Sequence, residues 1–337
     1  MAQSSGVVPS LPIAQSLVRR PTIIEINGYL QSLLPVRQGD VAFEYHIPRS
    51  GHFNPKSAQP AHAILSITPT AGFYNALNRA AEAAAAWPST RPTPLWAFLH
   101  RPWQLDRRRV PRGATIVSSH KAFDEVLTVG NNEALAAKLG MDVAATAVIQ
   151  GYKGDPERTI AIVGPLNTPV VRRTLRSQLE TEFGSFEGAY GFDEDEDKEE
   201  ANEPAANEEQ NIRCVAIMNA FHPEEVYTVS EMATAMGLAP NINDCRGVLY
   251  LTGAVREPGL EAALKKGMAV VCVGHRTCEE WGIRHLASVF RERWPGLQVQ
   301  EILEAEEPRA VKPKSSARPA PQTTTESLVE NELDSIK

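Results

Sequence analysis

Three histidines in this chain stand close behind short apolar runs. His100, His120 and His275 each come within three residues of the end of such a run. Continuous apolar runs of four to six residues, rich in β-branched side chains, are typical of strands that are buried on both faces. In open α/β sheets, ligands bind beyond the carboxyl ends of the strands. These three histidines are therefore the first candidates for a functional site.

Two of the three histidines have a carboxylate four residues further on. Asp124 follows His120, and Glu279 follows His275. Imidazole together with carboxylate is a ligand set suited to zinc, iron or manganese, because neutral imidazole donates a lone pair while carboxylate balances the metal charge. If the preceding strands share a sheet, or face each other across two lobes, these side chains would converge on one or two metal ions.

A purely structural interpretation competes with this metal site. Thr277 and Glu280 have the spacing of a capping box for a following helix, and Glu279 would then be a first-turn acid favoured by the helix dipole. Two further histidines, His46 and His52, lie in a loop broken by proline and glycine, where solvated side chains are expected. Spacing alone leaves both interpretations open.

The elements that must position these residues alternate between strand and helix. Residues 247–286 have the pattern strand, helix, strand, helix, with a glycine stop at Gly267. The alternation predicts an α/β or mixed α+β fold in two lobes. Further strands are predicted at 61–67, 95–99, 114–117, 159–163, 212–218 and 297–302, and helices at 22–34, from 68 to about 87, 131–140 and 169–183.

An acidic stretch divides the chain. Residues 184–211 are too charged and too poor in apolar side chains to bury a core, so we expect a linker or surface insertion there. This places an N-terminal lobe at 21–183 and a C-terminal lobe at 212–303. Residues 1–20 and the polar tail 304–337 are predicted to be disordered. The first segment lacks acids, as transit peptides do, but its prolines favour a cytoplasmic protein over a mitochondrial one.

Composition is that of an ordinary globular chain. With 337 residues, 42% of them hydrophobic and 22% charged, the chain is large enough for two cores. The formal net charge of −7 is concentrated in the acidic stretch, so the remainder is near neutral and indicates no class of partner. No apolar run approaches the roughly 20 residues of a membrane span. Reduced, buried thiols are expected for the four cysteines, which are Cys214, Cys245, Cys272 and Cys278.

Residues 247–286, the segment with the strand, helix, strand, helix pattern, resemble the C-terminal signature of the NIF-three-like family. Its members are also called the "GTP cyclohydrolase type-two homologue" proteins. Thr252-Gly253 and Gly274-His275 stand where that family has T-G-E-x-x-H-H and G-H-x-x-T-E. Two further blocks are similar to family segments in the same order. They are SHKAFDEVLTVGNNEALAAKLG at 119–140, similar to H-T-x-x-D followed by G-V-N, and LHRPW at 99–103, similar to an H-H-P turn.

The resemblance implies a two-lobed fold around a dinuclear metal site, commonly in ring-shaped hexamers, with no settled reaction. Carried onto this sequence, it implies four metal ligands, which are His100, Asp124, His275 and Glu279. His120 belongs to the same motif as Asp124 and would orient a ligand from the second shell. The implied cofactor is zinc, iron or manganese, with one or two ions per chain, and the alternative is that none is bound.

Departures from the family pattern concentrate around this site. Arg101 occupies the second position of H-H-P, where the family has a ligand histidine. An arginine cannot ligate a metal, but it could contact an anionic group. TGAVREP at 252–258 lacks the acid and both histidines of T-G-E-x-x-H-H, and NAFHPEE at 219–225 replaces a glycine-rich turn. The W-D-N-x-G block that the family has near its N-terminus is not recognisable in this sequence. These changes favour one metal or weak binding.

Two functions follow from this pattern. One is a metal-dependent, hydrolase-like enzyme of unknown substrate. The alternative is a non-catalytic, metal-poor scaffold or interaction protein of the same fold, with a protein partner. In either case we expect a homo-oligomer. Nucleic-acid binding ranks last, because it would rest on one short basic segment, 101–112, on a near-neutral body.

Overall fold

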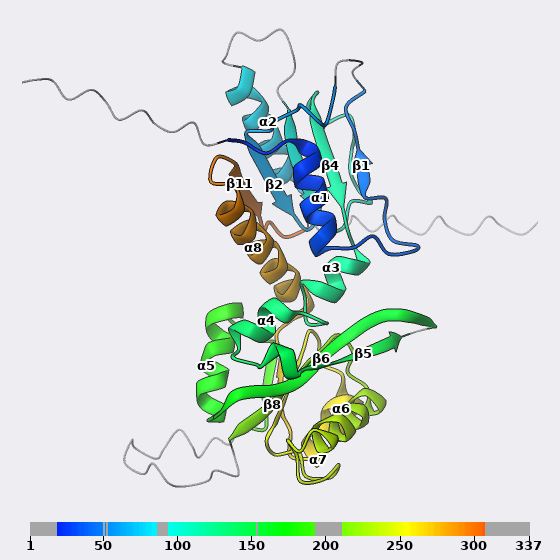
Figure 1. The fold of residues 1–337 in the computed structure, drawn as a ribbon, viewed down its shortest axis with the longest axis vertical. Coiled ribbons are helices and arrows are strands. Elements are labelled where there is room, and N and C mark those ends of the chain that lie inside the picture. The colour runs from blue at the N-terminus through cyan, green and yellow to red at the C-terminus, as the bar shows by residue number, and fades with distance from the viewer. Residues whose placement is uncertain are drawn as a thin grey trace, which may run out of the picture. The chain divides into compact units, whose positions relative to one another are not determined.

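A computed structural model gives the fold of this chain. It describes residues 19–49, 51, 53–85, 94–152, 154–192 and 211–306. The predictions for residues 1–18 and 307–337, for His52 and for most of the acidic stretch (193–210) lie outside these ranges. Its helices and strands belong to one compact unit that ends at Ala305. They form two sheets with helices on their faces, which confirms the mixed α/β fold class (Figure 1).

The first sheet has five strands in the order β1-β4-β3-β2-β11. The edge strand β1 pairs antiparallel with β4, and all other neighbours are parallel. Its strands are β1 (Glu44–His46), β2 (His62–Ser66), β3 (Leu95–Leu99), β4 (Ala114–Ser118) and β11 (Gln298–Ile302).

Successive side chains in these strands alternate between two cores. Ile64 and Ala97 pack with helix α2 (Ala71–Ala85), whereas Leu65 and Trp96 pack with helix α1 (Ile23–Leu33) on the opposite face. This is the period of two expected of strands, and because both faces are covered the strands are continuously apolar.

The second sheet has six strands in the order β5-β6-β8-β9-β10-β7. Strands β8, β9 and β10 are parallel, and β5, β6 and β7 pair antiparallel with their neighbours. The strands are β5 (Ala147–Tyr152), β6 (Asp155–Val170), β7 (Gly188–Tyr190), β8 (Ile212–Met218), β9 (Val248–Thr252) and β10 (Ala269–Cys272).

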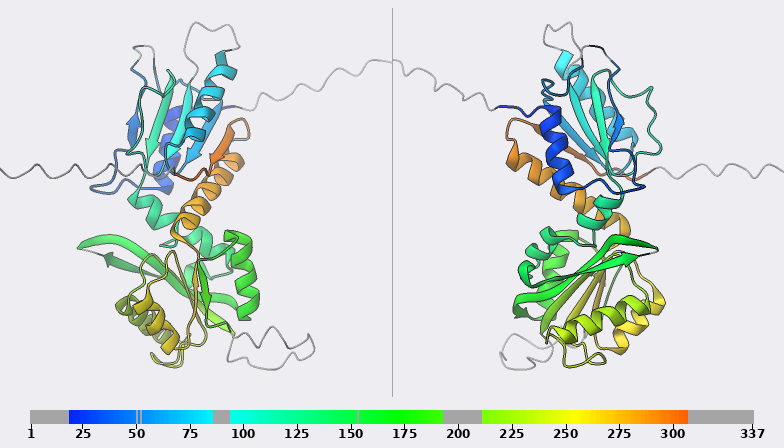
Figure 2. Two further views of the ribbon diagram at one scale, coloured as in Figure 1. Left: turned by 180° about the vertical axis from the view of Figure 1, so that it is seen from behind. Right: turned by 45° about the vertical axis from the view of Figure 1, so that its right-hand side comes forward.

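Helices cover both faces of this second sheet (Figure 2). Helices α4 (Glu133–Lys138) and α5 (Arg172–Phe183) pack on one face, where a 3-10 turn (Val143–Ala145) also lies. Helices α6 (Pro223–Ala235) and α7 (Glu257–Lys265) pack on the other.

Helix α8 (His275–Arg293) belongs to the cores of both sheets. Cys278 and Trp281, near its start, pack in a core of the six-stranded sheet. Leu286 and Phe290, further along, pack against the five-stranded sheet. The chain therefore leaves β10 of one sheet, runs along α8 and enters β11 of the other.

The sheets do not divide the chain at the acidic stretch. Strands β5 and β6, which precede it, pair with β8, which follows it, while β11 returns to pair with β2. Residues 188–190, inside the predicted linker, form the edge strand β7 against β10. These pairings join segments far apart in the chain, and periodicity along the sequence carries no information about them.

The predicted capping box at the start of α8 is wrong. The helix begins at His275, two residues before Thr277, and its N-cap is Gly274, with a φ of 96° and no side-chain cap. A positive φ of this size suits glycine, because it has no Cβ. Glu279 is consequently in the second turn of the helix and is buried. Among the described residues, no helix is long and apolar enough to cross a membrane.

Candidate metal centre

Two of the candidate histidines leave neighbouring parallel strands at the same edge of the five-stranded sheet. Leu99, the last residue of β3, pairs with Ser118, the last residue of β4. His100 and His120 therefore emerge side by side, and their rings stack with centroids 5.0 Å apart and an interplanar angle of 17°. Strand geometry alone brings these two residues together.

His100 is the buried centre of the site, with 0% of its side chain exposed. Its Nδ1 lies 3.1 Å from the carbonyl oxygen of Ser119. A carbonyl oxygen only accepts, so Nδ1 carries the hydrogen and Nε2 faces the other way. Nε2 lies 3.3 Å from Oδ1 of Asp124 and 3.2 Å from Oε1 of Glu279.

A nitrogen held between two carboxylates in the interior requires a positive charge. Burial opposes protonation of His100, but its hydrogen bonds to Asp124 and Glu279 outweigh burial and raise its pKa to about 9. Burial would raise the pKa of Glu279, but hydrogen bonds from His100 and His275 hold it well below its usual range. With its pKa raised in this way, a protonated His100 would supply the positive charge that a bound metal ion could also supply.

Asp124 links the two stacked histidines. Its Oδ1 faces His100, and its Oδ2 lies 3.7 Å from Nε2 of His120. One ligand atom from each of these three residues lies within 4.8 Å of the other two. Burial lowers the pKa of His120 despite the opposing charge of Asp124, which favours the neutral imidazole that binds metals.

Glu279 is shared among three basic groups. Its Oε1 faces His100 and also lies 3.3 Å from Nε2 of His275, while the guanidinium of Arg101 contacts Oε2. The hydrogen bond to Glu279 raises the pKa of His275, although burial opposes it. The residue that departs from the family pattern, Arg101, is therefore bound to a predicted metal ligand.

The short helix α3 (Lys121–Val126) positions Asp124 and is held at its start by a carboxylate. Oδ2 of Asp40 accepts hydrogen bonds from the backbone N–H groups of His120 and Lys121, at 3.3 Å and 3.0 Å. Asp40 satisfies donors that the first turn of a helix leaves unpaired. No sequence signal marks Asp40, because it lies 80 positions from its partner His120, in a loop without a motif.

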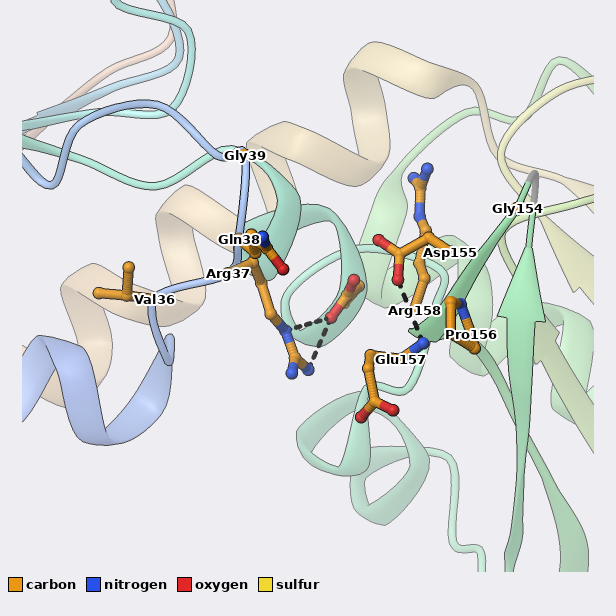
Figure 3. A pocket seen from close by; sticks show the side chains of 10 residues that line it. Val36, Arg37, Gln38, Gly39, Gly154, Asp155, Pro156, Glu157 and Arg158 are labelled. Atoms are coloured by element: carbon orange, nitrogen blue, oxygen red, sulfur yellow. Dashed lines mark hydrogen bonds and ion pairs between the residues drawn. The ribbon is translucent and has the colours of Figure 1, made fainter.

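Glu125, the residue after Asp124 in α3, ties the helix to the loop that follows α1. Nε and Nη2 of Arg37 donate to Oε2 of Glu125, at 2.9 Å and 2.8 Å. This pair lines a cavity of about 440 Å³, whose wall also includes Gly154 of the β5–β6 turn and residues 155–158 at the start of β6 (Figure 3). Consecutive residues of α3 therefore face different surroundings: Asp124 belongs to the histidine–carboxylate cluster, and Glu125 lines the cavity.

The donor set fits a divalent cation. Two imidazoles and a carboxylate gather their ligand atoms in His100, His120 and Asp124, and a second carboxylate, Glu279, adjoins them. The tautomer of His100 leaves a lone pair on Nε2 facing the carboxylates once its proton is lost. A metal ion would remove the repulsion between these electron-rich atoms, as would a proton on His100.

The structure brings all six sequence-predicted residues into one contact network. The predicted ligands His100, Asp124, His275 and Glu279 are joined by direct contacts, and Arg101 contacts Glu279. His120, predicted for the second shell, belongs with His100 and Asp124 to a group of ligand atoms that could hold a metal ion. His46, by contrast, lies in β1 at the edge of the sheet, as a residue outside this network.

The fold and the cluster define a two-sheet α/β protein with a histidine–carboxylate site beside the helix that links its sheets. The sequence profile of the Duf34/NIF3 family (NGG1p interacting factor 3) matches residues 107–308, which is more than half of the chain. The chain belongs to this family. A comparison with curated proteins found no match.

Solved structures of related fold cover most of the chain. Reduced HcgD from Methanocaldococcus jannaschii is 14% identical, with a TM-score of 0.50, over 84% of this chain and 98% of that one. A Bacillus cereus protein related to NIF3 is 12% identical, with a TM-score of 0.47, over 86% and 99%. Protein ybgI, described as of unknown function, is 17% identical, with a TM-score of 0.48, over 84% and 98%. The likeness to HcgD shows a common fold.

Proposed function

We propose that this protein binds one divalent metal ion through His100, His120 and Asp124. The observation that carries the proposal is that one ligand atom from each of these three residues lies within 4.8 Å of the other two, beside the fully buried imidazole of His100. Three protein ligands leave coordination positions open for a further ligand, as in catalytic rather than structural metal sites. Zinc, iron and manganese all accept this set.

Arg101 favours one metal over two. A second ion of a dinuclear pair would need Glu279 and a further ligand at the position that Arg101 occupies. The guanidinium instead contacts Oε2 of Glu279 and brings its own positive charge. Because this charge is permanent, it takes the place of a second cation rather than admitting one.

We propose a hydrolase-like activity, on an unknown substrate, for the site with its metal ion bound. A bound divalent ion would supply Lewis-acid chemistry towards a carbonyl or phosphoryl oxygen. The residues of the chain provide the surroundings. Glu279 orients His275, whose side chain is 67% exposed and can exchange a proton with solvent. His100 has no exposed surface and is fixed by its hydrogen bond to the carbonyl oxygen of Ser119.

The second candidate function is a metal-poor scaffold. It is favoured by the network itself, because a protonated His100, Arg101 and His275 already neutralise the two carboxylates. In that case the fold would serve an interaction with a protein partner. For either function we also propose a homo-oligomer in the cytoplasm, an expectation that rests on the family resemblance and that sedimentation velocity would test.

Metal content per chain decides between these functions. Inductively coupled plasma mass spectrometry on protein purified without added metal should find roughly one zinc, iron or manganese ion per chain, and Asp124→Asn should remove most of it. Asp142→Asn, at an exposed aspartate in the 3-10 turn region, is the matched control and should keep the metal.

One further variant tests the role assigned to Arg101. Arg101→His supplies an imidazole where the family has a ligand histidine, and it should raise the content toward two ions per chain. A folded wild-type protein that stays metal-free and resists loading would exclude the metal site and leave the scaffold.

A further inference from the structure

An exposed tryptophan stands beside the candidate metal centre. Trp103 is 56% exposed, although it is a large aromatic residue. Its ring lies edge-on to that of His120, with centroids 4.9 Å apart and an interplanar angle of 70°. His120 in turn stacks on His100, which packs on Phe123 at 4.4 Å. A line of rings therefore runs from the surface to the buried ligand.

The position of Trp103 distinguishes it from an incidental surface residue. It follows β3 by four residues, at the edge of the sheet where ligands bind in α/β proteins. His120 can cover at most one face of the indole, so the exposed area includes aromatic surface. Such a surface beside a polar cluster stacks well on a planar ring, because it offers large contact area at low cost in side-chain entropy.

The charges at the inner end of this line suit an anion. A divalent ion would be balanced by the carboxylates of Asp124 and Glu279. Arg101, which contacts Glu279, would then leave the loaded cluster with excess positive charge. Arg101 retains 26% side-chain exposure and His275 67%, so this side of the cluster is open to solvent.

We propose that the metal centre takes a small molecule with an anionic group and a planar ring, the ring stacking on Trp103. The phosphate or carboxylate of that molecule lies against the metal and Arg101. This inference rests on the proposed metal site and adds to it the class of ligand. Trp103 is then a residue that selects the ligand, and it holds no metal itself.

The neighbouring arginines fit a small ligand better than a nucleic-acid strand. The guanidinium of Arg109 lies 3.9 Å from the ring centroid of Tyr74. That of Arg107 lies 5.5 Å from the Tyr45 ring and donates to the Tyr45 carbonyl oxygen. With Arg101 on Glu279, three of the five arginines at 101–112 are engaged within the protein, and no continuous basic track for a phosphate backbone results.

Two probes separate the ring from the anion. Phenyl phosphate and inorganic phosphate carry similar charge and differ in a single aromatic ring. In titration calorimetry of the metal-containing protein, we expect phenyl phosphate to bind roughly tenfold more tightly, the low end of what stacking one ring contributes. Trp103→Leu should reduce this ratio to near one, and Trp103→Phe should keep most of it.

A matched control and a metal assay make each outcome decisive. Tyr227→Leu changes an aromatic residue of similar exposure (46%) on α6, and it should leave the ratio unchanged. An equal affinity for both probes in the wild type, or a ratio that survives Trp103→Leu, would overturn the ring contact. Normal metal content in those samples would show that only this inference has failed. A wild-type protein without metal would overturn the proposed function as well.

Discussion

At the scale of single residues, the site depends on one imidazole nitrogen. Nε2 of His100 lies between Asp124 and Glu279 at 3.3 Å and 3.2 Å, in a position without solvent. Two carboxylates facing a buried neutral nitrogen would repel its lone pair. Whichever cation occupies this position, a proton or a metal ion, therefore stabilises the folded chain. Proton and metal compete for the same atom.

This competition predicts a pH dependence of the metal-free protein. The pKa of folded His100 is raised from an ordinary 6.5 to about 9, so the folded state binds the proton more tightly than the unfolded state. Its contribution to the unfolding free energy, on the order of 3 kcal/mol, is complete below about pH 6.5 and is lost as pH rises through about 9. Urea unfolding across this range in the presence of a chelator measures it.

Two variants assign this pH dependence to its source. His100→Gln removes this titrating group, and its unfolding free energy should fall much less than that of the wild type as pH rises through about 9. His222→Asn changes an exposed histidine at the start of α6 to another helix-capping residue, and it should retain the wild-type slope. An unchanged slope in His100→Gln would place the titration at another group.

At the scale of elements, the site depends on how closely two helices approach. Glu279 of α8 reaches the partners carried by β3 and α3 because α8 lies against the end of α3. A glycine permits this contact. A Cβ atom at Gly282 would lie 2.6 Å from the carbonyl oxygen of Leu127 and 2.7 Å from Cζ of Phe123. No side chain fits there without a shift of one helix relative to the other.

Gly282→Ala is therefore expected to weaken metal binding, although Gly282 is not itself part of the metal centre. The added methyl group should push α8 away from α3, reduce the unfolding free energy by about 1–3 kcal/mol and weaken metal binding. Gly28→Ala in α1 is the matched control, because nothing lies within 4 Å of its added Cβ. That variant should be stabilised by up to about 1 kcal/mol. Chemical unfolding and metal titration of both test this, and unaltered metal affinity in Gly282→Ala would refute it.

At the scale of the compact unit, α8 makes the two sheets depend on each other. Trp281 belongs to a core of the six-stranded sheet, and Phe290 belongs to a core of the five-stranded sheet. The two residues are on one continuous helix, so neither core can lose α8 without disturbing the other. The strand order reinforces this, since β11 follows α8 and pairs with β2.

We expect the two sheets to unfold in a single cooperative transition. Phe290→Ala should lower the unfolding free energy of the whole unit by about 3–5 kcal/mol, because it removes a fully buried ring. Far-ultraviolet circular dichroism and tryptophan fluorescence should give coincident curves. Val171→Ala, at a residue that is 48% exposed, should change stability by no more than about 0.5 kcal/mol. Two transitions, of which Phe290→Ala moves only one, would contradict this.

The sequence alone determined the type of most elements and the family. Apolar runs located β2, β3, β4, β8, β9 and β10, and helical spacing located α1, α2, α5 and α7 close to their observed bounds. Both signals are local, since a strand buried on both faces is continuously apolar and a helix repeats every 3.6 residues. Short elements with weak patterns, such as β1 and β7, were missed.

The tertiary structure decided what the candidate residues contact. No local pattern indicates that Glu279 meets His100 across 179 positions, that Arg101 binds Glu279, or that Asp40 caps α3. These contacts depend on which strands pair and on how closely α8 approaches α3. Pairing is set by the burial of whole faces, a property of the assembled cores rather than of any one segment. The sequence therefore supplied the ligand types, and the fold supplied their common centre.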